Sequence, residues 1–172
     1  MPVRNQSLIT QKKAIFIDRD GVINSDVGHY YIYKTKDFIL NKGIVESLKA
    51  FYEAGFLLIV ISNQGGVDKG VYTNADVESV HAKMQSLLAD SGVQLTAIYY
   101  CPHHSYVQKC LCRKPLNLNI EKAISRFNID RKASWMIGDS ERDIEAGKLS
   151  NLNTLKLESN ENLYPYVAEI IA

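Results

Sequence analysis

The 172-residue sequence has few cysteines, no excess of charge of either sign and no long apolar run. Its three cysteines all lie within residues 101–112, whereas a disulfide framework needs an even number spread along the chain. No apolar run approaches the ~20 residues of a membrane-spanning helix. Residues 1–12 lack the apolar stretch of a secretory signal. We therefore expect a cytoplasmic protein with no membrane association.

The charges are nearly balanced, with 20 Lys and Arg against 19 Asp and Glu. A net charge of +1 disfavours a nucleic-acid partner, because such partners are met by basic surfaces. Hydrophobic residues make up 46% and charged residues 23%, as in ordinary soluble proteins. The length predicts a single domain over residues 1–172 that can bury a core without disulfides.

Short apolar runs alternate with segments of helical periodicity. The apolar runs are residues 14–17, 56–61, 96–100, 134–138 and 153–157. The helical segments are 43–54, 77–88, 118–127, 141–149 and a C-terminal stretch with Leu163, Val167 and Ile170. Continuous apolar strands separated by helices are typical of a parallel sheet covered on both faces. The sequence predicts an α/β fold, a Rossmann-like three-layer sandwich with a mostly parallel central sheet.

Polar residues follow the first, second and fourth of these strands directly. They are Asp18, Ser62-Asn63 and Asp139. Parallel strands share one carboxyl edge, where α/β proteins bind ligands, so these groups are expected to converge there.

The segment Asp18-Arg19-Asp20-Gly21 places two carboxylates two residues apart at a strand end. Two neighbouring carboxylates raise one another's pKa unless a cation lies between them. Such a pair suits an ionised nucleophile beside a proton carrier. A solvated turn rich in Asp and Gly is the alternative.

The rest of a motif set follows in order: Ser62 after the second strand, Lys114 in Arg113-Lys114-Pro115, and Gly138-Asp139 after the fourth strand. With the Asp18-Arg19-Asp20-Gly21-Val22 segment, this set resembles the haloacid dehalogenase-like superfamily of phosphotransferases. The resemblance covers residues 13–157 approximately.

The resemblance implies that Asp18 attacks phosphorus and that Asp20 protonates the leaving oxygen and then activates water. It implies Mg²⁺ on Asp18, the backbone carbonyl of Asp20 and Asp139. Ser62, Asn63 and Lys114 would bind the phosphoryl oxygens. Simpler alternatives are a turn capped by Ser62 and Asn63, and a solvated Lys114. Asp143 either supports the metal through water or caps the helix that follows.

Cys101, His103, Cys110 and Cys112 form a C-x-H, C-x-C pattern. Three thiols and one imidazole are a ligand set that Zn²⁺ accepts tetrahedrally, with no open position for water. We therefore predict a structural zinc site in a zinc-binding loop, residues 101–115, with His104 facing solvent or substrate. Three reduced cysteines, or a redox pair of Cys110 and Cys112, remain the alternatives.

This loop runs directly into Arg113 and Lys114, which resembles a branch of the superfamily without a large cap domain. The resemblance implies a monomeric Mg²⁺-dependent phosphatase acting on a small phosphorylated sugar, with Arg113 on a second phosphate or on the sugar. The implied substrate is the 7-phosphate of D-glycero-D-manno-heptose 1,7-bisphosphate. The six residues between His103 and Cys110 are closer to histidinol-phosphate phosphatases, so histidinol phosphate or another small metabolite is the alternative.

Other residues have simpler interpretations. Tyr30, Tyr31 and Tyr33 are predicted to cover a loop against the core, with a substrate rim as the alternative. His29 and His81 are predicted at the surface. A phospho-acceptor receiver domain also places an Asp at a strand end with Mg²⁺, but it needs neither Asp20 nor the cysteine pattern.

Overall fold

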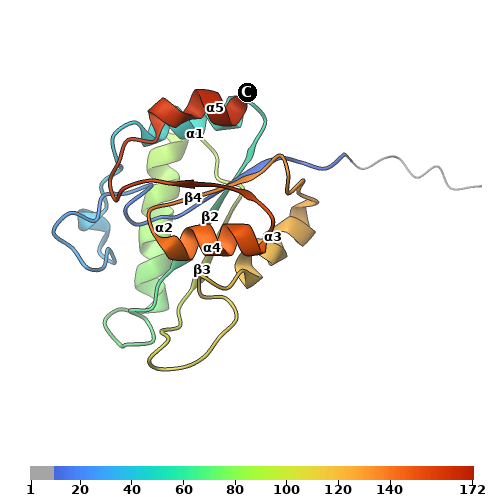
Figure 1. Ribbon diagram of the computed structural model, residues 1–172. Coiled ribbons are helices and arrows are strands. Elements are labelled where there is room, and N and C mark those ends of the chain that lie inside the picture. Colours follow the sequence, from blue (N-terminus) through green and yellow to red (C-terminus); the bar gives the residue numbers. More distant parts are fainter. Residues whose placement is uncertain (1–9) are drawn as a thin grey trace, which may run out of the picture.

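A computed structural model describes residues 10–172, and its centre is one parallel five-stranded sheet (Figure 1). The order across the sheet is β3-β2-β1-β4-β5. The strands are β1 (Ala14–Ile17), β2 (Leu57–Asn63), β3 (Ala97–Cys101), β4 (Trp135–Gly138) and β5 (Asn153–Lys156). Each predicted strand is present within two residues of its expected bounds, and the predicted parallel sheet is confirmed.

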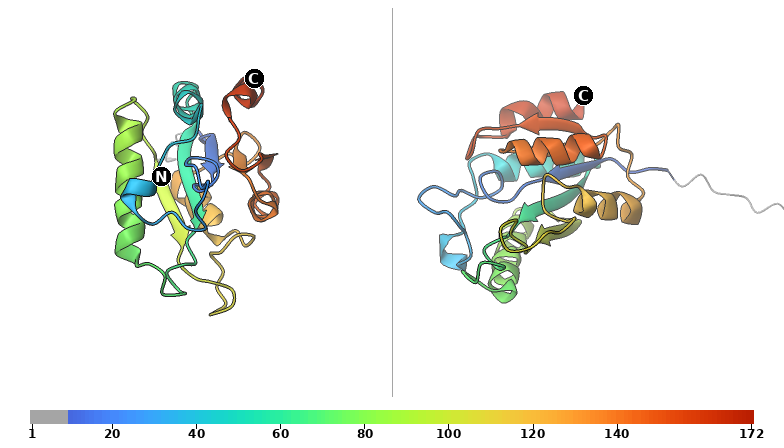
Figure 2. Two further views of the ribbon diagram at one scale, coloured as in Figure 1. Left: turned by 90° about the vertical axis from the view of Figure 1, so that its left-hand side faces the viewer. Right: turned by 60° about the horizontal axis from the view of Figure 1, so that its bottom comes forward.

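Helices cover both faces of the sheet and make three layers (Figure 2). On one face lie α1 (Ile44–Glu53), α2 (Asn74–Ala89) and the short α5 (Val167–Ile171). On the other lie α3 (Leu118–Phe127) and α4 (Glu141–Leu149). The predicted three-layer sandwich is therefore confirmed.

The central strand explains why its sequence is continuously apolar. Ile15 and Ile17 pack into the core beneath α1, whereas Ala14 and Phe16 pack into the core beneath α3. All four are fully buried, because successive side chains of a strand point to opposite faces and both faces are covered.

The register of the sheet brings the carboxyl ends of β1 and β4 beside the second half of β2, which continues to Asn63. Ile17 of β1 lies opposite Val60 of β2 and Ile137 of β4. The residues that follow these three positions therefore meet at one edge of the sheet, as the sequence predicted.

Local signals set the helix boundaries. Thr73 and Asp76 form a capping box at the start of α2. Gly43 precedes α1 with φ +76, a conformation that favours glycine. The C-terminal helix is shorter than predicted, because a 3-10 turn with a proline, Tyr164–Tyr166, precedes α5.

The three longest of the loops that leave the carboxyl edge of the sheet follow β1, β2 and β3 (Figure 2). They are residues 18–43, which contain the 3-10 turn Thr35–Asp37, and residues 64–73 and 102–117. Within residues 10–172, no helix has the length and apolar character needed to cross a membrane. Residues 1–9 lie outside the described residues. They make up most of the stretch in which the sequence lacks a secretory signal.

Candidate active site

Asp18 is held at the end of β1 by its own backbone. Its N–H donates to the carbonyl of Ile137 at 3.0 Å, and its carboxylate accepts the Arg19 N–H at 2.7 Å. The side chain is 15% exposed and lies 2.9 Å from the Lys114 ammonium. Burial raises the pKa of Asp18 to about 7, although the Lys114 charge acts in the opposite direction.

Asp20 is held by three side chains. Arg19 donates to both of its carboxylate oxygens, at 2.9–3.1 Å. Asn24 donates to Oδ1 at 3.1 Å and Gln64 donates to Oδ2 at 2.9 Å. Arg19 is fully buried and also donates to the carbonyl of Ile32. The carboxylate therefore has one fixed orientation while remaining 29% exposed.

Lys114 lies almost fully buried between carboxylates. Its Nζ contacts Asp18 and Asp143 and donates to the carbonyl of Ile61 at 2.7 Å. Burial opposes the charged form, but Asp143 and Asp18 outweigh it and raise the pKa of Lys114. The lysine predicted from the motif is thus a cation at the centre of the site, not a solvated surface residue.

Asn63 holds Lys114 through the backbone. Its amide accepts from the Lys114 N–H and donates to the Lys114 carbonyl, both at 3.0 Å. The oxygen and the nitrogen of this amide therefore each have a hydrogen-bond partner in the protein. Asn63 lies in the predicted site, but these contacts make it a support for Lys114.

Asp139 and Asp143 complete the acidic group at the end of β4. One oxygen from each of Asp18, Asp139 and Asp143 lies within 4.8 Å of the others, and the three residues can hold a metal ion. Burial and the nearby charge of Asp143 raise the pKa of Asp139. Asp143 also caps α4, since its carboxylate accepts from Ser140. Of the two roles left open for Asp143, these hydrogen bonds show the capping of α4.

The glycine of the first motif is required by space as well as by conformation. Gly21 has φ +81, and a Cβ there would lie 2.2 Å from a carboxylate oxygen of Asp139. Any side chain at this position would collide with the acidic group.

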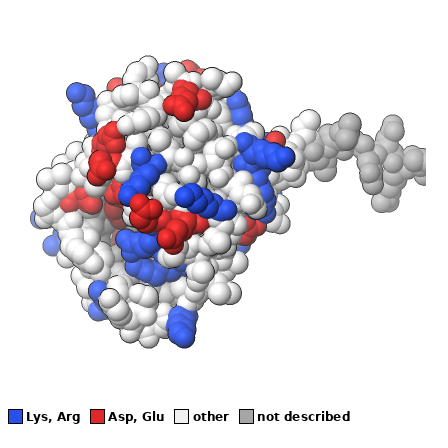
Figure 3. Space-filling view, in the orientation of Figure 1, with Lys and Arg blue, Asp and Glu red and all other residues white. Residues whose placement is uncertain are grey.

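These groups line a cavity of about 210 Å³. Asp18, Asp20, Ser62, Asn63, Arg113, Lys114 and Asp139, the predicted catalytic, phosphate-binding and magnesium residues, all contribute to its wall. His104, Arg142, Tyr30 and Tyr31 also line it. Figure 3 shows acidic and basic side chains gathered side by side around α4 and the loops beneath it, rather than in patches of one sign.

Several residues at the site escaped sequence reasoning. Gln64 and Arg19 hold Asp20, and Arg142 lines the cavity from the first turn of α4. Gln64 reaches Asp20 from a separate segment, and although Arg19 is next to Asp20 in the chain, only the folded turn shows that it donates to that carboxylate. Gln64 follows the Ser62-Asn63 motif directly, which is the one signal that could have drawn attention to it.

Two expectations about aromatic and histidine side chains need correction. His81 was expected at the surface but is only 3% exposed, because α2 turns it toward the core, where its ring packs on Tyr100. Tyr30 and Tyr31 line the cavity, whereas Tyr33 stacks on Tyr72 at 5.1 Å. Tyr33 therefore packs within the loop as predicted, whereas Tyr30 and Tyr31 take the alternative position at the rim of the cavity.

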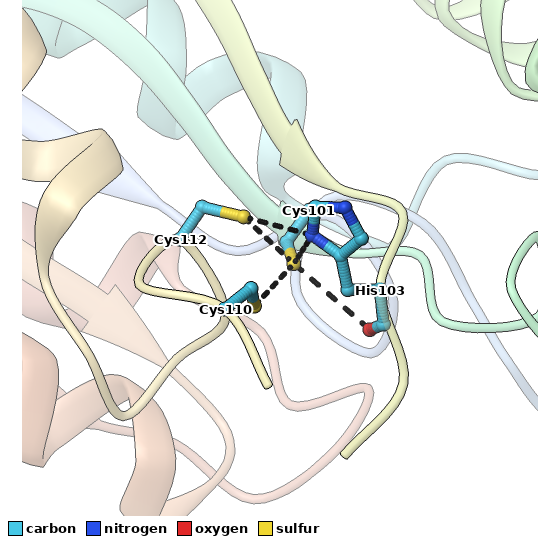
Figure 4. A group of neighbouring side chains, drawn as sticks. All are labelled: Cys101, His103, Cys110 and Cys112. Atoms are coloured by element: carbon cyan, nitrogen blue, oxygen red, sulfur yellow. Dashed lines mark hydrogen bonds between the residues drawn. The ribbon is translucent and has the colours of Figure 1, made fainter. Parts of the chain in front are cut away.

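Cys101, His103, Cys110 and Cys112 converge at the base of the loop that follows β3 (Figure 4). The Cys101 sulfur lies 3.6 Å from that of Cys110 and 3.1 Å from that of Cys112. His103 directs Nδ1 toward the sulfurs, 3.3 Å from Cys112. A tetrahedral zinc with Zn–S of about 2.3 Å would space its sulfurs by roughly 3.8 Å. The cluster fits one such ion if the Cys101–Cys112 separation widens by roughly 0.7 Å and the Cys101–Cys110 separation by roughly 0.2 Å.

The thiols of this cluster have different environments. Burial raises the pKa of Cys101. Burial acts likewise on Cys110, but hydrogen bonds, first that of the Arg113 N–H, outweigh it and lower the pKa to about 7. Cys110 is therefore the thiol most readily ionised for binding a cation.

Hydrogen bonds tie the cysteine loop to the turn after β2. The Gln64 N–H donates to the carbonyl of Cys101 at 2.7 Å, and Asp68 accepts from the N–H of His104 at 2.9 Å. His104 is buried against the cavity and does not join the cluster. Arg113 donates to the carbonyl of His103 at 3.0 Å, so the cluster and the cavity share one wall.

A parallel sheet whose first strand ends in a carboxylate paired with a buried lysine is the arrangement of the haloacid dehalogenase-like phosphatases. The chain is a phosphoric monoester hydrolase of this superfamily, which agrees with the resemblance seen in the sequence. Within it, the chain belongs to the family described as polynucleotide kinase 3 phosphatase, whose model matches residues 13–160.

Similar proteins of known name are bacterial sugar phosphatases. A D-glycero-beta-D-manno-heptose-1,7-bisphosphate 7-phosphatase from Pasteurella multocida is 37% identical over 174 residues, which is 94% of each chain. One from Helicobacter pylori is 40% identical over 161 residues, covering 92% of this chain and 91% of that one.

Solved structures of this fold include the D,D-heptose 1,7-bisphosphate phosphatase from B. bronchiseptica, complexed with magnesium and phosphate. It superposes with a TM-score of 0.80 at 27% identity, covering 91% of this chain and 86% of that one. A HAD-like phosphatase from Mesorhizobium loti has a TM-score of 0.78 at 26% identity, covering 83% and 70%.

Proposed function

We propose that this protein removes the 7-phosphate of D-glycero-D-manno-heptose 1,7-bisphosphate by a Mg²⁺-dependent mechanism with an aspartyl-phosphate intermediate. The observation that carries the proposal is the pairing of Asp18 with Lys114, at 2.9 Å, in a cavity that also holds Asp20. The assignment of this substrate comes from relatives named heptose-1,7-bisphosphate 7-phosphatase, whose alignments cover 94% and 92% of this chain. The names of these relatives specify the beta anomer, which we propose here too.

In the first step, a carboxylate oxygen of Asp18 forms a bond to phosphorus while the bond from phosphorus to the sugar oxygen breaks. Asp20 gives its proton to that oxygen, so the sugar leaves as an alcohol. Lys114 and the Ser62 hydroxyl stabilise the charge on the phosphoryl oxygens. The Lys114 charge also favours the ionised form of Asp18, in opposition to the effect of burial.

In the second step, Asp20 takes a proton from water as the water oxygen attacks phosphorus. The bond between Asp18 and phosphorus breaks, inorganic phosphate leaves, and Asp20 again holds its proton. The network of Arg19, Asn24 and Gln64 keeps Asp20 in one orientation for both proton transfers.

The acidic group fits a magnesium ion. Asp18 and Asp139 both have raised pKa values, and a divalent cation between them would relieve that unfavourable charge. Asp18, Asp139 and the backbone carbonyl of Asp20 would hold it, with Asp143 engaged mainly by Lys114. When bound, the ion supplies neutralisation of the negative charge shared by nucleophile and phosphate.

The cysteine cluster would hold zinc as a structural ion. Three cysteine thiolates and the His103 imidazole would fill the four ligand positions of the ion and leave none for reactive water. Its role would be to fix the loop that carries Arg113 and Lys114 beside the cavity. Arg113 would then face the second phosphate or the sugar.

The proposal is tested by measuring phosphate release with Mg²⁺ from heptose 1,7-bisphosphate and from histidinol phosphate, with Asp18→Asn as the blank. A kcat/KM at least 100-fold higher for the heptose would correspond to about 2.7 kcal/mol and would assign the substrate. The reverse ratio would assign histidinol phosphate, the alternative suggested by the short loop between His103 and Cys110.

A 3′-phosphorylated oligonucleotide belongs in the same assay, because the matching family is described by a polynucleotide activity. We expect no preferred turnover of it. The net charge of +1 provides no basic field for a phosphate backbone, and the relatives at 37–40% identity carry the sugar-phosphatase name.

A further inference from the structure

Gln64 joins the two sides of the cavity through one buried amide. Its Nε2 donates to Oδ2 of Asp20 at 2.9 Å and to Oγ of Ser62 at 2.7 Å. The amide nitrogen has two N–H groups, and both are used. Gln64 is 2% exposed, so water does not compete for these contacts.

Tyr72 decides which way this amide points. Its hydroxyl donates to Oε1 of Gln64 at 2.9 Å. A flipped amide would turn its carbonyl oxygen toward the Asp20 carboxylate, which is also an acceptor, and its N–H groups toward Tyr72. Burial raises the pKa of Tyr72, which keeps the hydroxyl a donor.

The Tyr72 ring is itself held in place. It is 5% exposed, stacks on Tyr33 and meets Tyr31 edge to face at 5.4 Å. Gly66 admits the ring, because a Cβ there would lie 2.1 Å from it. The hydroxyl therefore has a fixed position behind Gln64.

The two oxygens of Asp20 are not equivalent in this network. Oδ1 accepts from two nitrogens of Arg19 and from Asn24, whereas Oδ2 accepts from one nitrogen of Arg19 and from Gln64. Oδ2 is thus the less heavily engaged of the two oxygens, and it is the one whose direction the Gln64 contact sets.

We propose that Gln64 and Tyr72 are positioning residues that orient Oδ2 of Asp20 for proton transfer to the leaving oxygen of the substrate. This inference rests on the proposed function, since it assigns Asp20 the role of acid. It adds the two side chains that set the direction of that proton transfer, neither of which touches the substrate.

The leaving group distinguishes this role from a structural one. A primary alkyl ester, such as the 7-phosphate of the heptose, needs a proton on its leaving oxygen. p-Nitrophenyl phosphate releases a stable phenolate and needs none. Because kcat/KM reports the steps up to the first irreversible one, misorientation of Asp20 should slow the alkyl ester selectively.

The experiment compares kcat/KM for the two esters in Tyr72→Phe, which removes one hydroxyl and keeps the ring. We expect the alkyl-to-aryl ratio to fall about tenfold, the effect of one buried hydrogen bond on a proton transfer, with KM for the alkyl ester within about twofold. Gln64→Met, which removes the amide at similar volume, should lower the ratio further.

Two further variants serve as controls. Tyr166→Phe removes a hydroxyl that donates to Glu161 at 2.6 Å, remote from the cavity, and should leave the ratio unchanged. Asn63→Ala loosens the support of Lys114 and removes no side-chain hydrogen bond of Gln64 or Tyr72, so it should slow both esters alike. Denaturation midpoints of all variants separate loss of fold from loss of orientation.

Equal losses on both esters in Tyr72→Phe and Gln64→Met would overturn this inference and leave the proposed function standing. No hydrolysis of either ester by the unchanged protein would instead overturn the proposed function, and this inference with it.

Discussion

At the scale of single residues, the site is built from charges that are buried together. Lys114 is 2% exposed and its partners Asp18 and Asp143 are 15% and 0% exposed. Burying any one of these charges alone would be costly, but the cation between two carboxylates offsets part of that cost and favours their ionised forms. The reactive form of Asp18 therefore depends on the lysine.

Lys114→Met should lower the free energy of unfolding by about 3 kcal/mol and abolish turnover, because it leaves two buried carboxylates without their cation. The loss should be larger at pH 8 than at pH 5. Without the lysine the folded-state pKa values of the carboxylates rise, so protonation at low pH relieves the repulsion. Urea denaturation at both pH values measures this.

Lys156→Met provides the matched control. Lys156 pairs with Glu141 at the surface, where both side chains are more than one-third exposed. This variant should leave the unfolding curve almost unchanged. A similar loss in both variants would contradict the importance of burial for the Lys114 pair.

At the scale of secondary-structure elements, helix α4 and the cysteine loop, which accompany the last two motifs of the set, deliver side chains to the cavity. The first turn of α4 carries Asp143 and Arg142, and the loop carries Arg113. Local structure in these two elements should therefore affect activity as well as stability.

Ser140→Ala tests the first of these elements. Ser140 and Asp143 form a capping box at the start of α4, and its loss should cost about 1 kcal/mol of unfolding free energy. Because Asp143 also contacts Lys114, kcat/KM should fall as well. Thr73→Ala removes the equivalent cap of α2 and should affect stability alone; parallel unfolding and kinetic measurements compare them.

Cys110→Ser tests the second element. We expect one zinc ion per unchanged chain by elemental analysis, and a zinc affinity at least about 100-fold lower in the variant, because a thiolate ligand is lost. Because the loop carries Arg113 to the cavity, a loop that is held less firmly should also raise the KM for the substrate.

Lys109→Ala, an exposed change in the same loop, should retain both the zinc and the activity. Equal zinc binding by the Cys110→Ser variant would contradict a site made of four ligands.

At the scale of the whole molecule, a buried histidine links stability to pH. Burial, aided by Arg19 and opposed by Asp20, lowers the pKa of His81 from 6.5 to about 4. Below pH 6.5 the unfolded chain takes up a proton that the folded protein does not. This contribution to stability is therefore complete above pH 6.5 and is lost as the pH falls toward 4.

Between these pH values, the unfolding free energy of the unchanged protein should fall by about 3 kcal/mol more than that of His81→Gln. Urea titrations from pH 7.5 to 4 measure the difference. His29→Gln, at an exposed position, should follow the unchanged protein. Parallel pH profiles for all three proteins would show that His81 does not drive the effect.

Prediction from the sequence succeeded where neighbours along the chain carry the information. Apolar runs and helical spacing gave five strands and the main helices, and the strand-end residues Asp18, Ser62 and Asp139 were expected to meet. It failed for His81, since the face that a helical residue presents depends on where the helix packs.

Sequence by itself therefore determined the parallel sheet, the edge at which the polar groups gather, and the four residues of the cysteine cluster, because each follows from local period or spacing. Only the tertiary structure decided what each polar group contacts. Asn63 supports Lys114, and Tyr72 and Gln64 hold Asp20, because loops far apart in the chain meet at the end of the sheet. Such contacts depend on strand register and loop path, which no short segment of the chain encodes.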